Sequence, residues 1–369
     1  MTKKHLQLDL KFSAIDHSAD YAALSGAKRL RRLYSDLRQE GIKSVHYDWH
    51  WKRIEPEPGN YNRVQLARYK MAKDQMKKAG LEPPAIILSN PPRWAVRLYK
   101  KDKEKFFTAY KKYIEEVRKY LETDFDFKIE KIQILNELNN FVYNPIAAED
   151  LPKLCRITRK VFFEYNPDIK LAASMLVGNL TPAFRLGIRI DSYLKKFEKI
   201  KDNFDIISLN YFPGLWYWPI REAGWKYKSW FGQLGKLQEV FRIVSGWGFD
   251  YELGEVGFPT NGFWGNEEKQ VRFYESFFDA LRPMLEDLKN NGARLPCEIC
   301  FFEASDEEPE NCFGKIIGKN FSPEYNFGLF RSDGKRKLIL QETPDPPGEK
   351  TVLKSRLGNI LNRFKSKGN

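Results

Sequence analysis

Short apolar runs alternate with longer amphipathic stretches along most of the chain, and this alternation constrains the fold more than any other feature. Several of the short runs are almost continuously apolar, which is typical of parallel strands covered on both faces. We expect strands at residues 6–12, 44–49, 85–90, 131–137, 170–176, 204–211, 249–255 and 297–303.

Between these runs, apolar residues recur at helical spacing. The expected helices span residues 21–40, 63–79, 103–122, 149–165, 230–244 and 267–289, and Gly41 and Gly80 are typical helix C-terminal stops. Strands that alternate with helices in this way predict an α/β protein, a single-domain (β/α)8 TIM barrel. An open doubly wound sheet would alternate in the same way. It would usually carry a Gly-rich phosphate loop after its first strand, and KFSAIDHSAD supplies none.

The last part of the chain differs in composition from the rest. We expect the barrel over residues 1–340, a proline-rich linker over 341–350 and a basic amphipathic helix over 351–369. Apolar residues of that helix share one face, namely Leu353, Leu357, Ile360, Leu361 and Phe364. This pattern fits a helix packed on the protein, and almost as well a helix that contacts an anionic membrane or a partner protein.

Composition excludes several classes of protein. With 42% hydrophobic and 30% charged residues, the chain is expected to be soluble and globular. The net charge of +13 comes from lysines and arginines scattered among glutamates, without a nucleic-acid motif, so we expect no nucleic acid partner. The N-terminus has no apolar run of signal-peptide length, which predicts a cytoplasmic location, with the C-terminal helix as the one candidate for membrane association.

The cysteines predict neither a disulfide scaffold nor a metal site. The chain has 4 of them. Cys297 and Cys300 have the spacing of a zinc or redox pair, but side chains three apart in a strand point to opposite faces. We expect them to serve in packing.

Polar side chains collect at the expected C-terminal ends of the strands, where barrel enzymes carry their catalytic residues. They are Asp48 and His50 after the second strand, Asn90 after the third, Asn136 and Glu137 after the fourth, Asn210 and Tyr211 after the sixth, Glu255 after the seventh, and Glu303 and Asp306 after the eighth. Tryptophans follow the third, sixth and seventh strands, namely Trp94, Trp216, Trp218 and Trp264. Flat rings at a barrel mouth suit the apolar faces of sugars.

Glu137 and Glu255 form the most informative pair. They end the fourth and seventh strands, which lie across the barrel mouth from each other. Two facing carboxylates suit retaining glycoside hydrolysis, in which one protonates the leaving oxygen and the other attacks the anomeric carbon. Strand alternation places Glu252 on the opposite face from Glu255. We expect Tyr211 to hydrogen-bond Glu255, which would favour its charged form.

The motifs around these residues resemble clan A glycoside hydrolases, the "4/7" retaining superfamily, over residues 6–340. ILNELN is similar to the Asn-Glu signature of strand four in that clan, and GEVGFPTNG is similar to the nucleophile segment of family 17 β-1,3-glucanases. FFEASDEEP and NFGLFRSDGKRK resemble the strand-eight region of bacterial members of family 17. WKRIEPEPGNYN and NPPRWA are similar to strand exits of related β-galactosidase and β-xylosidase families.

The resemblance implies a retaining glycoside hydrolase or transglycosylase that acts on β-linked sugars, with a β-glucan as the expected substrate. Glu137 would be the acid/base, Glu255 the nucleophile and Asn136 the ligand of the sugar 2-hydroxyl, with no cofactor or metal. Asp48, His50, Asn90, Glu303, Asp306 and the mouth tryptophans would contact an oligo- or polysaccharide. The tryptophan that often ends strand eight in the clan is replaced by Phe301, Phe302 and Glu303. A non-catalytic carbohydrate-binding barrel, or an accessory subunit of a membrane polysaccharide synthase, stays open as the alternative.

Overall fold

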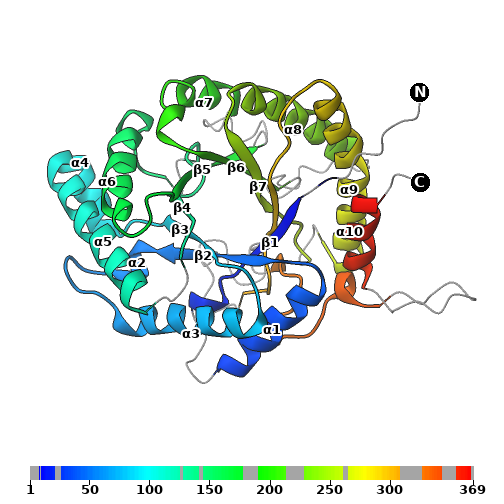
Figure 1. Ribbon diagram of the computed structural model, residues 1–369, viewed down its shortest axis with the longest axis horizontal. Helices are drawn as coiled ribbons and strands as arrows, with labels where there is room; N and C mark the ends of the chain where they lie inside the picture. Colours follow the sequence, from blue (N-terminus) through cyan, green and yellow to red (C-terminus); the bar gives the residue numbers. More distant parts are fainter. Residues whose placement is uncertain are drawn as a thin grey trace, which may run out of the picture.

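The strands close into one all-parallel barrel with helices around its outside, which confirms the (β/α)8 expectation (Figure 1). The computed structural model describes residues 8, 10–20, 26–124, 128–140, 144–177, 190–212, 228–260, 265–307, 326–342 and 355–366. In chain order the strands are β1 Lys11–Ile15, β2 Ser44–His50, β3 Ala85–Ser89, β4 Lys131–Ile134, β5 Lys170–Val177, β6 Ile206–Tyr211, β7 Asp250–Val256 and β8 Glu298–Phe301.

The sequence misplaced the first strand, and it also predicted an end for the fourth strand three residues beyond the observed end at Ile134. The alternation of Leu8, Leu10 and Phe12 predicted a strand over 6–12, and all three side chains are indeed buried. The strand itself starts at Lys11, because its register is set by its neighbours: Ser13 pairs with Ser44 of β2, and Lys11 pairs with Glu298 of β8. The end of β1 is therefore three residues later than expected, at Ile15.

Six of the longer helices and the C-terminal helix occupy predicted segments, whereas the helices at residues 93–101 and 190–197 were not predicted. The longer ones are α1 Ala27–Gln39, α3 Arg63–Ala79, α4 Arg93–Lys101, α5 Lys103–Asp124, α6 Leu151–Phe163, α7 Ile190–Phe197, α8 Lys228–Gly246, α9 Glu267–Asn290 and α10 Arg356–Ser366. Shorter turns of helix are η1 Ser18–Asp20, α2 Trp51–Ile54, η3 Ala148–Asp150, η5 Lys201–Asn203 and η8 Leu338–Leu340. In the part of the chain that the structure describes, no helix combines the length and apolar character needed to cross a bilayer.

Helix ends follow ordinary capping rules. The Asn62 side chain accepts a hydrogen bond from the Gln65 backbone N–H at 3.1 Å and caps α3. Gly80 ends the same helix with φ of 74°, a left-handed conformation that glycine adopts without strain, as predicted. Cys155, Cys297 and Cys300 are free cysteines, and Cys300 is buried.

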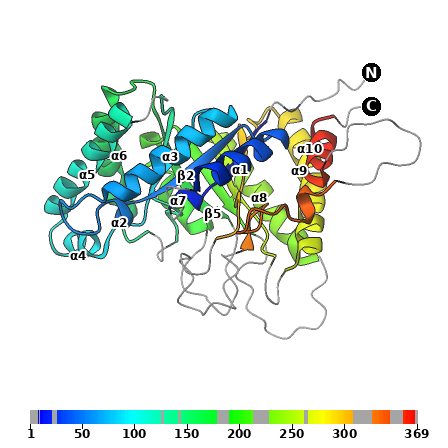
Figure 2. The same cartoon turned by 90° about the horizontal axis from the view of Figure 1, so that it is seen from below.

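The C-terminal helix α10 lies beside α9 on the outside of the barrel (Figures 1 and 2). Phe364 is 3% exposed, with its ring against Phe12 of β1 and Phe278 of α9. Leu357, Ile360 and Leu361 are also buried. The sequence left open whether this helix packs on the protein, on a membrane or on a partner. In the structure its apolar face packs on the protein. Leu353 lies outside the described residues.

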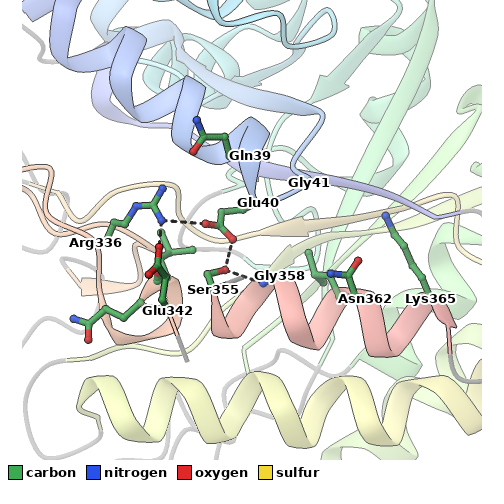
Figure 3. Close-up of a pocket in the computed structure, with 12 residues that line it drawn as sticks. Gln39, Glu40, Gly41, Arg336, Glu342, Ser355, Gly358, Asn362 and Lys365 are labelled. Atoms are coloured by element: carbon green, nitrogen blue, oxygen red, sulfur yellow. Dashed lines mark hydrogen bonds and ion pairs between the residues drawn. The ribbon is translucent and has the colours of Figure 1, made fainter. Parts of the chain in front are cut away.

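The start of α10 is held by a polar cluster that closes one side of a surface pocket of about 840 Å³ (Figure 3). The buried Glu40, next to the end of α1, accepts hydrogen bonds from Ser355 and, at 3.3 Å, from Arg336. The Ser355 hydroxyl in turn accepts the Gly358 N–H at 2.9 Å and so caps α10. This cluster joins the end of α1 to two segments near the C-terminal end of the sequence.

Candidate active site

Glu137 and Glu255 both lie at the C-terminal mouth of the barrel and are each 5% exposed. Asn210 at the end of β6 pairs with Glu255 in the strand register, and its amide also faces Glu137, with 3.5 Å between Nδ2 and Oε1. The structure therefore brings the two carboxylates of the sequence hypothesis to one site. Their charges interact directly.

A β-bulge aims Glu255 into the barrel. Between Ser208 and Asn210 of β6, the partner strand runs from Glu252 to Glu255, so β7 carries one extra residue. Gly254 sits at this point, and a Cβ there would come within 1.8 Å of the Ser208 hydroxyl oxygen. Only glycine allows this approach of the two strands.

The bulge also corrects the expectation for Glu252. Simple alternation predicted that Glu252 would face away from the interior, on the opposite side from Glu255. Instead Glu252 bonds to Lys131 of β4 at 2.7 Å, inside the barrel near its N-terminal end. The extra residue puts both glutamates inside the barrel, at opposite ends.

The segment after β4 presents Glu137 in an unusual backbone conformation. Leu135 and Glu137 have positive φ values of 62° and 45°. Such conformations cost of order 1–3 kcal/mol each in non-glycine residues and cluster at functional sites. The Glu137 N–H donates to the Ser174 hydroxyl at 2.7 Å, and the Asn140 amide donates to Glu137 Oε2, also at 2.7 Å.

Asn136 is oriented by the same network. Its side-chain oxygen accepts from Gln133 at 3.1 Å and from Ser174 at 2.9 Å. The amide nitrogen is thereby left to donate to Glu255, and this hydrogen bond opposes protonation of that carboxylate. Asn136 thus connects the segment after β4, which contains Glu137, with the end of β7.

The electrostatics of Glu255 differ from the expectation. Burial, followed by the charges of Glu137 and Asp48, raises the pKa of Glu255 well above its ordinary value of 4.5. The charge of His17 and the hydrogen bond from Asn136 act in the opposite direction. In the free protein Glu255 therefore holds a proton more readily than an isolated glutamate.

The predicted contact from Tyr211 to Glu255 is replaced by the one from Asn136. Successive strand residues face opposite sides. Asn210 faces the mouth, so Tyr211 faces the helices, and its ring stacks on Phe277 of α9 with 5.9 Å between centroids. It is 1% exposed and belongs to the hydrophobic core.

Asp48, His50 and Asn90 come together at the ends of β2 and β3, as the sequence suggested. Ser89 donates to Asp48 and lies 3.0 Å from His50 Nδ1, and the Asn90 amide lies 2.6 Å from the same ring nitrogen. His50 Nε2 pairs with Asp20 at 3.1 Å. Although burial raises the pKa of Asp20, the charge and hydrogen bond of His50 together with the charges of Arg53 and His17 outweigh burial and lower this pKa to about 2.

Trp94 is half-buried in an aromatic cluster behind the mouth. Its indole N–H donates to the backbone oxygen of Glu55 at 3.3 Å, and its ring meets Trp51 edge-to-face. The structure thus assigns Trp94 mainly to packing. Trp216, Trp218 and Trp264 lie outside the described residues.

The two acidic residues expected after β8 have different surroundings. Glu303 is fully buried and hydrogen-bonds His17. Asp306 accepts the Lys337 ammonium at 2.6 Å and the Gly328 N–H at 2.9 Å, and burial raises the pKa of Asp306 to about 6 while Lys337 opposes the shift. Asp306 therefore holds the segment that contains Gly328 and Lys337, and its expected sugar contact stays a prediction.

Sequence reasoning missed several residues of the site. His17 contacts Glu303 and Glu307, and its Nε2 is 3.8 Å from Asp48. Burial alone would lower the pKa of His17, but the two glutamates outweigh burial and raise this pKa well above 6.5. His17 was overlooked because β1 was expected to end at residue 12. Asn140 and Ser174 carry no motif that would have singled them out.

The chain resembles several solved structures in its fold. No family model and no curated protein sequence matches the chain. Among solved structures, β-glycosidase BGL167 matches with a TM-score of 0.65 and 14% identity, over 99% of this chain and 98% of the other. The family 1 β-glucosidase from Thermotoga maritima gives 0.65 and 13%, over 99% of both chains.

A third structure is a GH5_18 protein from Streptomyces cattleya in complex with Manb1-4GlcNAc. It matches with a TM-score of 0.63 and 13% identity, over 98% of this chain and 82% of its own. These structural neighbours are clan A glycoside hydrolases. At this level of identity the likeness establishes the shared (β/α)8 barrel.

Proposed function

We propose that this protein is a retaining glycoside hydrolase, or transglycosylase, that acts on β-linked glycosides. The observation that carries the proposal is the pair of buried, interacting carboxylates of Glu137 and Glu255 at the mouth of a barrel. Burying two carboxylates side by side is unfavourable, and a barrel with only a structural role would not need them there.

In this proposal Glu137 is the acid/base. The Asn-Glu order at the end of β4, the positive φ of Glu137 and the amides of Asn140 and Asn210 support a fixed position for its carboxyl group. It protonates the leaving oxygen in the first step. In the second step the same group takes a proton from the attacking water.

Glu255 is the proposed nucleophile. Its carboxylate attacks the anomeric carbon as the bond to the leaving oxygen breaks, which gives a covalent glycosyl intermediate. Water, or a sugar hydroxyl in transglycosylation, then releases the sugar with net retention of configuration. Asn136, whose amide donates to Glu255 in the free protein, is the proposed hydrogen-bond donor to the sugar 2-hydroxyl during the reaction.

Two observations support the proposed substrate class: the solved neighbours are described with β-linked sugars, and the motifs near strands seven and eight resemble β-glucanases. The solved neighbours are described as a β-glycosidase, a β-glucosidase and a protein bound to Manb1-4GlcNAc. Within this class we propose a β-glucan, because the segment around Glu255 resembles family 17 β-1,3-glucanases.

The test is turnover of a panel of aryl β-glycosides and β-glucans, with the product anomer followed by NMR. We expect release of the aryl group with the β-anomer formed first. Inverted product would contradict the retaining mechanism. Saturable binding of a glucan without turnover would identify a carbohydrate-binding barrel instead.

A further inference from the structure

Three potential metal-ligating side chains meet where the first and last strands of the barrel join. His17 follows β1, and Glu303 and Glu307 follow β8, its hydrogen-bonded neighbour. The ligating atoms of the three residues all lie within 4.8 Å of one another. His17 Nδ1 is 3.0 Å from Glu307 Oε1 and is also hydrogen-bonded to Glu303 Oε1. We call these residues the mouth triad.

The mouth triad has more negative than positive groups. Glu303 is fully buried, and among the described residues its Oε2 has no hydrogen-bond partner. Within the same part of the chain, ion pairs to Glu303 and Glu307 come only from His17. Lys337 interacts electrostatically with Glu303, but its ammonium group is bonded to Asp306. A buried carboxylate oxygen is costly unless a donor or cation meets it.

The other end of the barrel provides an internal comparison. His46, Glu252 and Glu298 form a cluster of the same residue types there. A lysine ammonium is at the centre of that cluster: Lys131 Nζ lies 2.7 Å from Glu252, 3.1 Å from Glu298 and 3.5 Å from His46. Within the described residues, the mouth triad has its own imidazole as the only positive group in contact.

We propose that His17, Glu303 and Glu307 bind a divalent cation. An imidazole nitrogen with two carboxylates is a donor set that suits Zn²⁺, and also Mn²⁺. Three protein ligands leave a coordination position for water or a substrate hydroxyl. Asp48 lies on the far side of the His17 ring, 3.8 Å from Nε2, where an outer carboxylate orients a metal-bound histidine. Binding of the ion is independent of whether Glu137 and Glu255 hydrolyse a glycoside.

The experiment titrates Zn²⁺ into untagged protein that has been stripped of metal with a chelator, using isothermal calorimetry. Mn²⁺ serves as a second probe, because the exposed Cys297 thiol favours softer ions. We expect one ion per chain. His17→Gln and Glu307→Gln should weaken binding at least about 10-fold, the lower end of what even an outer-shell change costs.

The matched control is His46→Gln in the cluster that already contains Lys131, and it should bind the probe like the wild type. Glu307 is only partly buried, so Glu307→Gln should fold even if His17→Gln does not. The proposal would be overturned if the wild type bound neither Zn²⁺ nor Mn²⁺ stoichiometrically. Wild-type affinity in Glu307→Gln would also overturn it, whatever the glycosidase assays show.

Discussion

The side-chain amide of Asn136 hydrogen-bonds the carboxylate of Glu255 and so links the end of β4 to the end of β7. The amide has this orientation because its oxygen is held by Gln133 and Ser174. A group fixed in advance in this way loses little freedom when the transition state forms.

Asn136→Ala should therefore lower kcat far more than it raises KM. The loss of one preorganised donor typically costs about 10²–10³ in kcat. Steady-state kinetics on an aryl β-glycoside measure this, with the exposed Asn362→Ala on α10 as the control. A change confined to KM would mean that Asn136 only helps to bind the substrate.

Glu137→Gln should separate substrates by their leaving group. General acid catalysis typically contributes about 10²–10⁴-fold, so hydrolysis of a glycoside with a poor leaving group should fall by that amount. A dinitrophenyl glycoside needs no protonation to leave, so its glycosylation step should stay close to wild type. If pre-steady-state assays show the same loss of glycosylation rate on both substrates, Glu137 is not the general acid.

The acidic limb of the pH–rate profile should lie above the ordinary glutamate range. Glu255 must be ionised to attack, and burial, Glu137 and Asp48 raise its pKa above 4.5, whereas His17 and Asn136 partly oppose the shift. Activity is therefore lost as the pH falls through this raised pKa.

Removing the charge of Glu137 tests the cause of that shift. In Glu137→Gln, assayed on the activated substrate, the acidic limb should move to lower pH. Glu104→Gln changes a glutamate whose side chain is 81% exposed and should leave the limb in place. An acidic limb that does not move in Glu137→Gln would show that the two carboxylates are not coupled.

Phe364→Ala should destabilise the whole fold. The ring is buried between Phe12 and Phe278, and removal of a buried phenylalanine costs about 3–5 kcal/mol. Urea denaturation should show this loss, whereas Phe163→Ala, at a residue 61% exposed, should change stability by less than about 0.5 kcal/mol. Wild-type stability in Phe364→Ala would mean that α10 is not docked in solution.

The sequence predicted the barrel well because parallel strands buried on both faces leave a simple apolar signature. Six of the strands and the bounds of α3 follow that signature closely, whereas β4 ends at Ile134, three residues before the expected end. The signature failed at β1, where Leu8 and Leu10 are buried next to the strand and only the register with β2 and β8 fixes its start.

The site was predicted less completely, for reasons of register and of distance along the chain. Glu137 and Glu255 could be found because each lies at the expected C-terminal end of a strand, although β4 itself ends at Ile134 and Glu137 follows it. The bulge at Gly254, which reverses the expected face of Glu252, depends on Ser208 and Asn210 of the neighbouring strand. The Asn136–Glu255 hydrogen bond and the His17–Glu303 contact join residues that are far apart in the sequence, and no local pattern records them.

The central claim, that Glu255 is the nucleophile, is tested most directly by Glu255→Ala with azide as an external nucleophile. Without azide, turnover of an aryl β-glycoside should fall by at least about 10⁴-fold, the upper end of what the loss of an acid/base costs. Azide can enter the space left by the carboxylate and attack from the same side, so rescued turnover should yield the α-glycosyl azide. Unchanged turnover without azide, or a rescued product with the β configuration, would contradict the assignment.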